Sequence, residues 1–228
     1  MSVLSDNLTA ALTQANNGKL QEARPLIDQV LAEQYFQAGY AAYQNGQYAQ
    51  ALPYYRAAIE QLPQWYEPHW HAGVCCHQLR RYAEAIDHYR HAVALKPDHA
   101  VARYHLAKCL KDDGQLDAAL SVYEQALALD PENPEILYSQ GLLHLLRGDW
   151  LEGWEGYELR LQGSDRASIE HRPATQLPKW HGEEVEQGGG IIVYAEQGMG
   201  DSIQCFRYAL VLRERFARVK ISVHFYRG

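Results

Sequence analysis

The chain has 228 residues, of which 47% are hydrophobic and 21% are charged, which is typical of a soluble globular protein with one large or two modest domains. Its net charge of -7 argues against a nucleic-acid partner, because phosphate contacts need clustered Lys and Arg side chains. Residues 1–8 lack a signal-peptide pattern, and no apolar run reaches the roughly 18 residues that would span a membrane. We therefore expect a cytoplasmic protein without a membrane span.

The cysteines follow no disulfide or metal-site spacing; they are Cys75, Cys76, Cys109 and Cys205. Cys75 and Cys76 are neighbours, so they cannot face each other on one helix. The histidines form no HExxH and the cysteines no CxxC. We expect reduced, packed thiols and no metal site.

An internal repeat is marked by three prolines that stand at equal intervals along the chain, Pro63, Pro97 and Pro131. Each proline closes a segment of the form Ala, three residues, Tyr, two residues, Ala, four residues, Pro. Small residues and turn residues precede each segment at the same spacing, at Gly39, Gly73 and Ala107 and at Gly46, Arg80 and Gly114. Small side chains let two antiparallel helices approach, a tyrosine fills the space beside them, and proline ends the second helix. The pattern therefore predicts stacked helical hairpins.

The repeat resembles the tetratricopeptide repeat (TPR), which implies a mainly α fold, an α-solenoid built from hairpins of about 34 residues. We expect the solenoid over residues 1–161, with a partial N-terminal unit, three good repeats at 32–133 and a degenerate repeat at 134–161. In the last of these Gly153 replaces the alanine and the proline is missing. The predicted helices are 4–16, 20–33, 35–45, 48–61, 67–79, 82–95, 101–112, 116–129, 135–146 and 150–161.

The first helix of each TPR hairpin lines a concave groove, and the resemblance places a partner protein or peptide there. The residues at the groove-facing positions are Phe36, Gln37, Tyr40, Tyr43, Trp70, His71, His77, Tyr104, His105, Lys108 and Lys111. This surface is aromatic with a basic end. Aromatic residues at helical spacing also pack in cores, and we assign the repeat tyrosines Tyr55, Tyr82, Tyr89 and Tyr123 to the core. For His71 and His105 both interpretations stay open, whereas a ligand-facing role is favoured for Trp70, Tyr40 and Tyr104.

The pattern changes after residue 161. Residues 162–189 are predicted to be a linker, and the strand run 191–195 then leads into Glu196-Gln-Gly-Met-Gly-Asp-Ser-Ile-Gln204. Gly198 and Gly200 suit a tight turn, Asp201 or Ser202 suits the start of a helix that runs to about residue 216, and a second strand follows at 219–225. Residues 190–228 therefore predict a short βαβ Rossmann-like fragment.

This motif, together with Gly153-Trp154 and the stretch from Leu177 to Glu183, resembles the junction in bacterial proteins whose TPRs precede a heptosyltransferase-like glycosyltransferase domain. The resemblance implies that Asp201 is the general base on an acceptor hydroxyl. It also implies acceptor or anion contacts from the surrounding motif residues Glu196, Gln197, Gly198, Gly200 and Ser202. The alternative role for Asp201 is that of a helix N-cap.

The family's second lobe, which holds a nucleotide sugar, has no counterpart before Gly228. We therefore expect residues 190–228 to be an incomplete N-terminal lobe with no cofactor in this chain; a nucleotide sugar belongs to a complete transferase. The lobe would dock on the repeats, pair with a partner chain or stay partly disordered. We favour a TPR scaffold that is inactive by itself. The alternative is a fragment or subunit of a glycosyltransferase that acts on a TPR-recruited acceptor.

Overall fold

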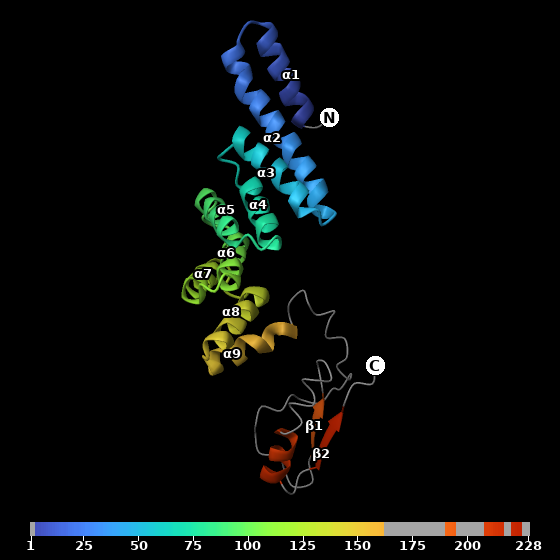
Figure 1. Ribbon diagram of the computed structural model, residues 1–228, viewed down its shortest axis with the longest axis vertical. Helices are drawn as coiled ribbons and strands as arrows, with labels where there is room; N and C mark the ends of the chain where they lie inside the picture. The colour runs from blue at the N-terminus through green and yellow to red at the C-terminus, as the bar shows by residue number, and fades with distance from the viewer. Residues whose placement is uncertain (1–2, 162–189, 195–207, 217–219, 225–228) are drawn as a thin grey trace. The chain divides into compact units, whose positions relative to one another are not determined.

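The computed structural model describes residues 3–161, 190–194, 208–216 and 220–224, and it divides into two compact units at Leu159 and Arg160. The first unit is helical (Figure 1). Its helices are α1 (Val3–Asn16), α2 (Leu20–Gln44), α3 (Tyr48–Gln61), α4 (Tyr66–Gln78), α5 (Tyr82–Leu95), α6 (Ala100–Asp112), α7 (Leu116–Leu129), α8 (Pro134–Arg147), α9 (Trp150–Tyr157) and the 3-10 turn η1 (Glu158–Leu161).

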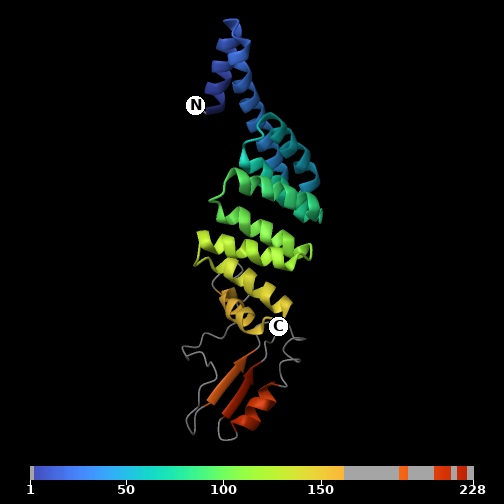
Figure 2. The same cartoon turned by 90° about the vertical axis from the view of Figure 1, so that its left-hand side faces the viewer.

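Consecutive helices of the first unit pair into antiparallel hairpins that stack in sequence order (Figure 2). The helices from α3 to α8 begin and end within one residue of their predicted bounds. The prediction of a mainly α stack of helical hairpins is therefore confirmed. None of the helices in the described ranges is long and apolar enough to span a bilayer.

The hairpin turns share one backbone geometry. Positive φ angles recur at the repeat spacing, at Gly46, Arg80, Gly114 and Gly148. The next N–H closes the turn on a carbonyl five residues back, as Arg81 does on Cys76 at 2.8 Å. Glycine adopts this conformation without strain, whereas Arg80 holds a φ of 58° with a side chain.

Of the repeat tyrosines, Tyr55, Tyr89 and Tyr123 lie fully buried between helices, whereas Tyr82 is half-buried and packs against the core. Tyr55 and Tyr89 each cover the small residue of the first helix in the same hairpin. A Cβ atom at Gly73 would lie 2.8 Å from the Tyr89 ring, and one at Gly39 would lie 3.0 Å from the Tyr55 ring. The tyrosines therefore pack in the core, as predicted.

The predicted break between helices 20–33 and 35–45 is wrong, because α2 is a single helix of 25 residues. Later hairpins are separated by a short loop such as residues 62–65, which follows a helix ending at Gln61. No glycine or proline interrupts residues 26–38, so nothing ends the helix there. The N-terminal unit is short of a full repeat because this loop is missing.

The fourth hairpin packs more closely than the others. A Cβ atom at Gly141 would lie 2.7 Å from the Cα atom of Gly156, and one at Gly153 would lie 2.6 Å from Leu145. The backbones of α8 and α9 are therefore in direct contact at Gly141, where the earlier hairpins have a tyrosine ring against the small residue. The predicted helix 150–161 is α-helical only to Tyr157 and ends in η1.

In the second unit, β1 (Gly190–Tyr194) and β2 (Lys220–His224) pair in parallel, with Ile191 opposite Ile221. Residues 208–215, between them in the sequence, are helical. A parallel pair requires a crossover connection, and this order agrees with the predicted strand, helix and strand. A Rossmann-like lobe is not shown by two strands. The predicted linker at 162–189 lies outside the described residues.

Candidate functional site

The residues predicted to line the groove lie on α2, α4 and α6, the first helices of three successive hairpins. Their exposure differs widely. Gln37, Tyr40 and Lys108 are exposed, whereas His71 and Tyr104 are buried. The half-buried members are Phe36, Tyr43, Trp70, His77, His105 and Lys111. The structure therefore brings these positions onto neighbouring helices but leaves only some of them open to a ligand.

An aromatic cluster forms where α2 packs against α4, and His71 lies at its centre. Phe36 and Tyr43 on α2 each approach the His71 ring edge-on at 5.3 Å between ring centroids, and Tyr40 does so at 5.6 Å. Tyr55 on α3 stacks on the same ring at 5.2 Å. Such pairs are a favoured geometry of aromatic packing. The exposed ring of Tyr40 therefore packs against the buried ring of His71.

One repeat later, His105 takes the place of His71. It stacks on Tyr89 at 6.0 Å, and its ring lies 5.4 Å from Trp70 and 5.2 Å from Tyr104. Burial lowers the pKa of both histidines from 6.5 to about 4, which keeps the rings neutral at pH 7. His71 therefore packs in the interior as a neutral ring, whereas His105 keeps part of its ring at the surface.

The basic end of the surface lies on α6. Lys108 is exposed. His77 donates from Nε2 to Asp112 Oδ2 at 2.8 Å, and the Nζ atom of Lys111 lies 3.3 Å from Asp112 Oδ1. Asp112 therefore offsets part of the charge of Lys111, and Lys108 is the more accessible cation.

Tyr104 connects two hairpins rather than presenting its ring to solvent. Its hydroxyl donates to Glu135 Oε1 at 3.2 Å and accepts from Ser139 Oγ at 3.4 Å, both on α8. Trp70 is half-buried between His71 and His105, with ring centroids 4.6 Å and 5.4 Å away. The surface ring of this part of the groove is therefore Trp70 rather than Tyr104.

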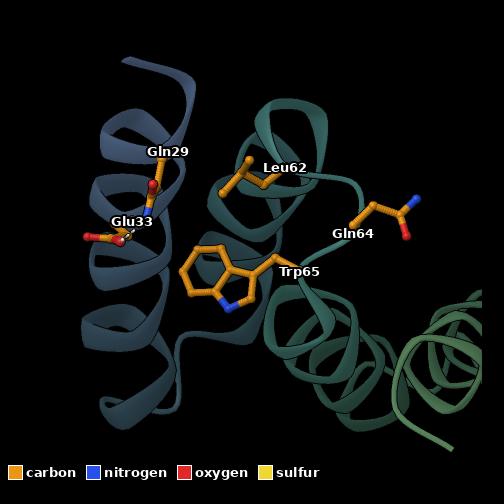
Figure 3. Close-up of a pocket in the computed structure, with 5 residues that line it drawn as sticks. All are labelled: Gln29, Glu33, Leu62, Gln64 and Trp65. Atoms are coloured by element: carbon orange, nitrogen blue, oxygen red, sulfur yellow. Dashed lines mark hydrogen bonds between the residues drawn. The ribbon is translucent and has the colours of Figure 1, made fainter. Parts of the chain in front are cut away.

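The structure also contains a pocket that sequence reasoning missed. It has a volume of about 400 Å³ and lies between α2 and the loop that joins α3 to α4 (Figure 3). Its lining residues are Gln29, Glu33, Leu62, Gln64 and Trp65. They lie outside the first-helix positions from which the groove was predicted. The available signal was a tryptophan in the short loop after Pro63, where a polar residue is usual.

The motif residues from the transferase resemblance lie outside the described residues; they are Glu196, Gln197, Gly198, Gly200, Asp201 and Ser202. Their roles as catalytic base and acceptor contacts stay predictions. Within the described parts of the chain, no three His, Cys, Asp or Glu side chains gather in a way that could hold a metal ion.

Two family models match the helical unit. The model described as "Tetratricopeptide repeat" matches residues 36–100, and the one described as "TPR repeat" matches residues 109–148. No curated protein sequence matches the chain. The matched ranges contain Tyr55, Tyr89 and Tyr123, the buried tyrosines of the three hairpins described above, and leave out residues 101–108 of α6.

Solved structures share this fold. MamA from Desulfovibrio magneticus RS-1 is 19% identical, with a TM-score of 0.56 over 72% of this chain and 96% of that chain. YrrB, a TPR protein with an unusual peptide-binding site, is 20% identical, with a TM-score of 0.54 over 68% of this chain and 84% of that one. The first TPR of Spaghetti (RPAP3), bound to an HSP90 peptide, is 20% identical, with a TM-score of 0.51 over 53% of this chain and 95% of that one. The likeness concerns the fold, and the two family models identify TPR repeats within residues 36–148.

Proposed function

We propose that the chain is a scaffold that binds a peptide or protein segment along the surface of α2, α4 and α6. The observation that carries this proposal is a row of ring contacts across three hairpins, from Tyr40 through His71 and Trp70 to His105. Each contact fixes a ring at the surface or just below it. Rigid aromatic side chains lose little conformational entropy on binding, so such a row suits an extended ligand.

The charges along the row indicate what the ligand carries. The α2 and α4 part presents neutral rings, because His71 is buried and holds no proton at pH 7. The α6 part presents Lys108. An extended segment with apolar or aromatic side chains and an acidic group opposite Lys108 fits this order. The peptide site of YrrB and the peptide complex of Spaghetti show what related folds do, and they support the proposal by analogy.

The test compares a double variant on the first helices of the hairpins with a double variant on the second helices. Peptides selected from a random library on the wild-type chain are titrated against Tyr40→Ala with Lys108→Ala. We expect binding about tenfold weaker, because an exposed ring and a charge contact are both lost. The matched control is Tyr54→Ala with Arg90→Ala, an exposed tyrosine and an exposed cation on α3 and α5. Equal affinity of both double variants would refute a site on the first helices.

A second candidate is a glycosyltransferase role in which residues 190–228 form one half of a site that a partner chain completes. The motif resemblance favours it, as does the parallel pairing of β1 and β2 in the predicted order. Calorimetry with a panel of nucleotide sugars tests it. Binding or turnover that Asp201→Ala abolishes would support the transferase role, and silence across the panel would favour the scaffold as the function of this chain by itself.

A further inference from the structure

The pocket between α2 and the α3–α4 loop combines a carboxylate, an indole ring and an apolar wall. Glu33 and Gln29 lie on α2, and Trp65 faces them across the cavity (Figure 3). The side chain of Glu33 accepts a hydrogen bond from Gln29 Nε2 at 3.3 Å. Among the described residues, no basic side chain forms a salt bridge with Glu33. Leu62 closes the apolar side.

Each residue that lines the pocket has an equivalent position one repeat later, so the two sets of side chains can be compared. Glu33 corresponds to Glu67, Leu62 to Lys96 and Trp65 to His99. The ring pair recurs too: Trp65 lies 4.9 Å from Phe36, and His99 lies 6.5 Å from Trp70. The two junctions are therefore versions of one site.

At the second junction the chain supplies its own cation. The Nζ atom of Lys96 lies 4.6 Å from the centre of the Tyr66 ring, and that ring lies 5.3 Å from His99. Burial and the charge of Lys96 lower the pKa of His99, while Asp98 and Glu67 oppose the shift. An ammonium group over a ring is a favourable cation–π arrangement.

At the first junction two of these side chains are smaller. Ala32 stands where the second junction has Tyr66, and Leu62 stands where it has Lys96. The carboxylate and a large ring remain, as Glu33 and Trp65, but the internal ammonium group is replaced by an apolar side chain. A cavity of about 400 Å³ is present there. Its volume is sufficient for a long side chain to enter.

We propose that this pocket binds a lysine or arginine side chain of the partner peptide, with Glu33 as the counter-charge and the Trp65 ring as the cation–π surface. The inference rests on the proposed function, because it treats the cation as part of a peptide. Trp65 packs against Phe36, so the pocket continues the row of rings at its α2 end. A ligand would then place a basic residue at α2 and an acidic group near Lys108 on α6.

The experiment uses the full chain and two capped pentapeptides, Ala-Ala-Lys-Ala-Ala and its norleucine counterpart, which has the same side-chain length without the charge. Each is titrated to millimolar concentrations while the indole N–H signal of Trp65 is followed by NMR. We expect the lysine peptide to shift this signal and to bind about three- to tenfold more tightly than the norleucine peptide. Equal binding of the two peptides, or no shift with either, would overturn the inference.

Three variants locate the effect. Glu33→Gln keeps the shape of the pocket and should remove the preference for lysine. Leu62→Lys should abolish binding, because it places an internal ammonium group where Lys96 lies in the next repeat. Glu67→Gln is the matched control, since its site already holds Lys96, and it should bind as the wild type does. Lysine preference that survives Glu33→Gln would contradict the proposal.

The outcome is separable from that of the groove experiment. If library peptides bind through Tyr40 and Lys108 while the lysine pentapeptide shows no preference, the pocket inference fails and the scaffold function stands. If no library peptide binds the wild-type chain at all, the scaffold function fails, whatever the pentapeptide does.

Discussion

The ring of His71 stacks on the ring of Tyr55, with 5.2 Å between their centroids and 17° between their planes. The two residues belong to successive hairpins, since Tyr55 lies on α3 and His71 on α4. Tyr55 is also the ring that covers Gly39 within its own hairpin. A single stacked pair therefore joins the interior of one repeat to the next, and its histidine must stay neutral to remain there.

Acid should therefore destabilise the stack. Burial lowers the pKa of His71 from 6.5 to about 4, so below pH 6.5 the unfolded chain takes up a proton that the folded chain does not. The neutral ring of His71 makes its full contribution to the unfolding free energy above pH 6.5, and this contribution is lost as the pH falls toward 4. His71→Phe should remove about 1–2 kcal/mol of the decrease in unfolding free energy between pH 7 and pH 5. Urea denaturation followed by circular dichroism at both pH values measures it.

The His71→Phe variant should still show some pH dependence of its unfolding free energy. Burial also lowers the pKa of His88 and His105 to about 4, so the phenylalanine variant should retain part of the slope. An unchanged difference between pH 7 and pH 5 in His71→Phe would contradict burial of a neutral ring at this position.

Arg80→Gly should stabilise the protein. Arg80 holds a left-handed φ of 58° at a position where the turns at Gly46, Gly114 and Gly148 have glycine. Relief of this strain, less the added entropy of glycine in the unfolded chain, predicts a gain of about 0.5–1 kcal/mol in unfolding free energy. The reverse change at the equivalent turn, Gly114→Ala, meets no atom within 4 Å and should cost about 1 kcal/mol through backbone strain alone. Chemical denaturation of both variants measures the difference.

Gly141→Ala should cost more stability than Gly73→Ala. The added methyl group at Gly141 would lie 2.7 Å from the Cα atom of Gly156, so two backbones would have to separate. At Gly73 it would lie 2.8 Å from the Tyr89 ring, so a side chain rather than a second backbone would have to shift. We expect about 2–3 kcal/mol for the first change and about 1 kcal/mol for the second. Equal losses in thermal or urea unfolding would show that α8 and α9 separate easily.

The three cysteines of the repeats should react slowly with alkylating agents. Burial raises the pKa of Cys75 and of Cys109 to about 12, and it raises the pKa of Cys76 as well. The thiolate is the reactive form, so little of it exists in the folded protein at pH 8. Iodoacetamide labelling followed by peptide mass spectrometry should modify these residues only when guanidinium unfolds the chain. Rapid labelling of Cys75 without denaturant would contradict its burial.

Much of the helical unit could be predicted from the sequence, because the packing constraints recur at a fixed spacing. Tyrosine, alanine, glycine and proline each fill one steric role in every hairpin, so the repeat period determines the helix bounds. The continuous helix α2 was missed because a partial unit was treated as a shortened repeat. Its continuity follows from the absence of a helix breaker between residues 26 and 38.

The candidate site was harder to predict, because exposure depends on neighbouring repeats. The repeat position of His71 and Tyr104 places both residues on first helices. It does not predict that Tyr55 covers His71 or that Glu135 accepts a hydrogen bond from Tyr104. The pocket depends on which side chains are small at one junction and large at the next. The sequence shows that Leu62 corresponds to Lys96, but only the folded chain shows that a cavity forms beside Leu62.

The 25 residues of α2 belong to two hairpins at once, since the helix pairs with α1 near its start and with α3 near its end. A loop between repeats lets neighbouring hairpins rotate slightly against each other, whereas a shared helix transmits torque directly. A force applied to α1 would therefore reach Tyr40 through the continuous backbone hydrogen bonds of α2. The N-terminal hairpin is therefore joined to the first full repeat by a continuous helix rather than by a loop.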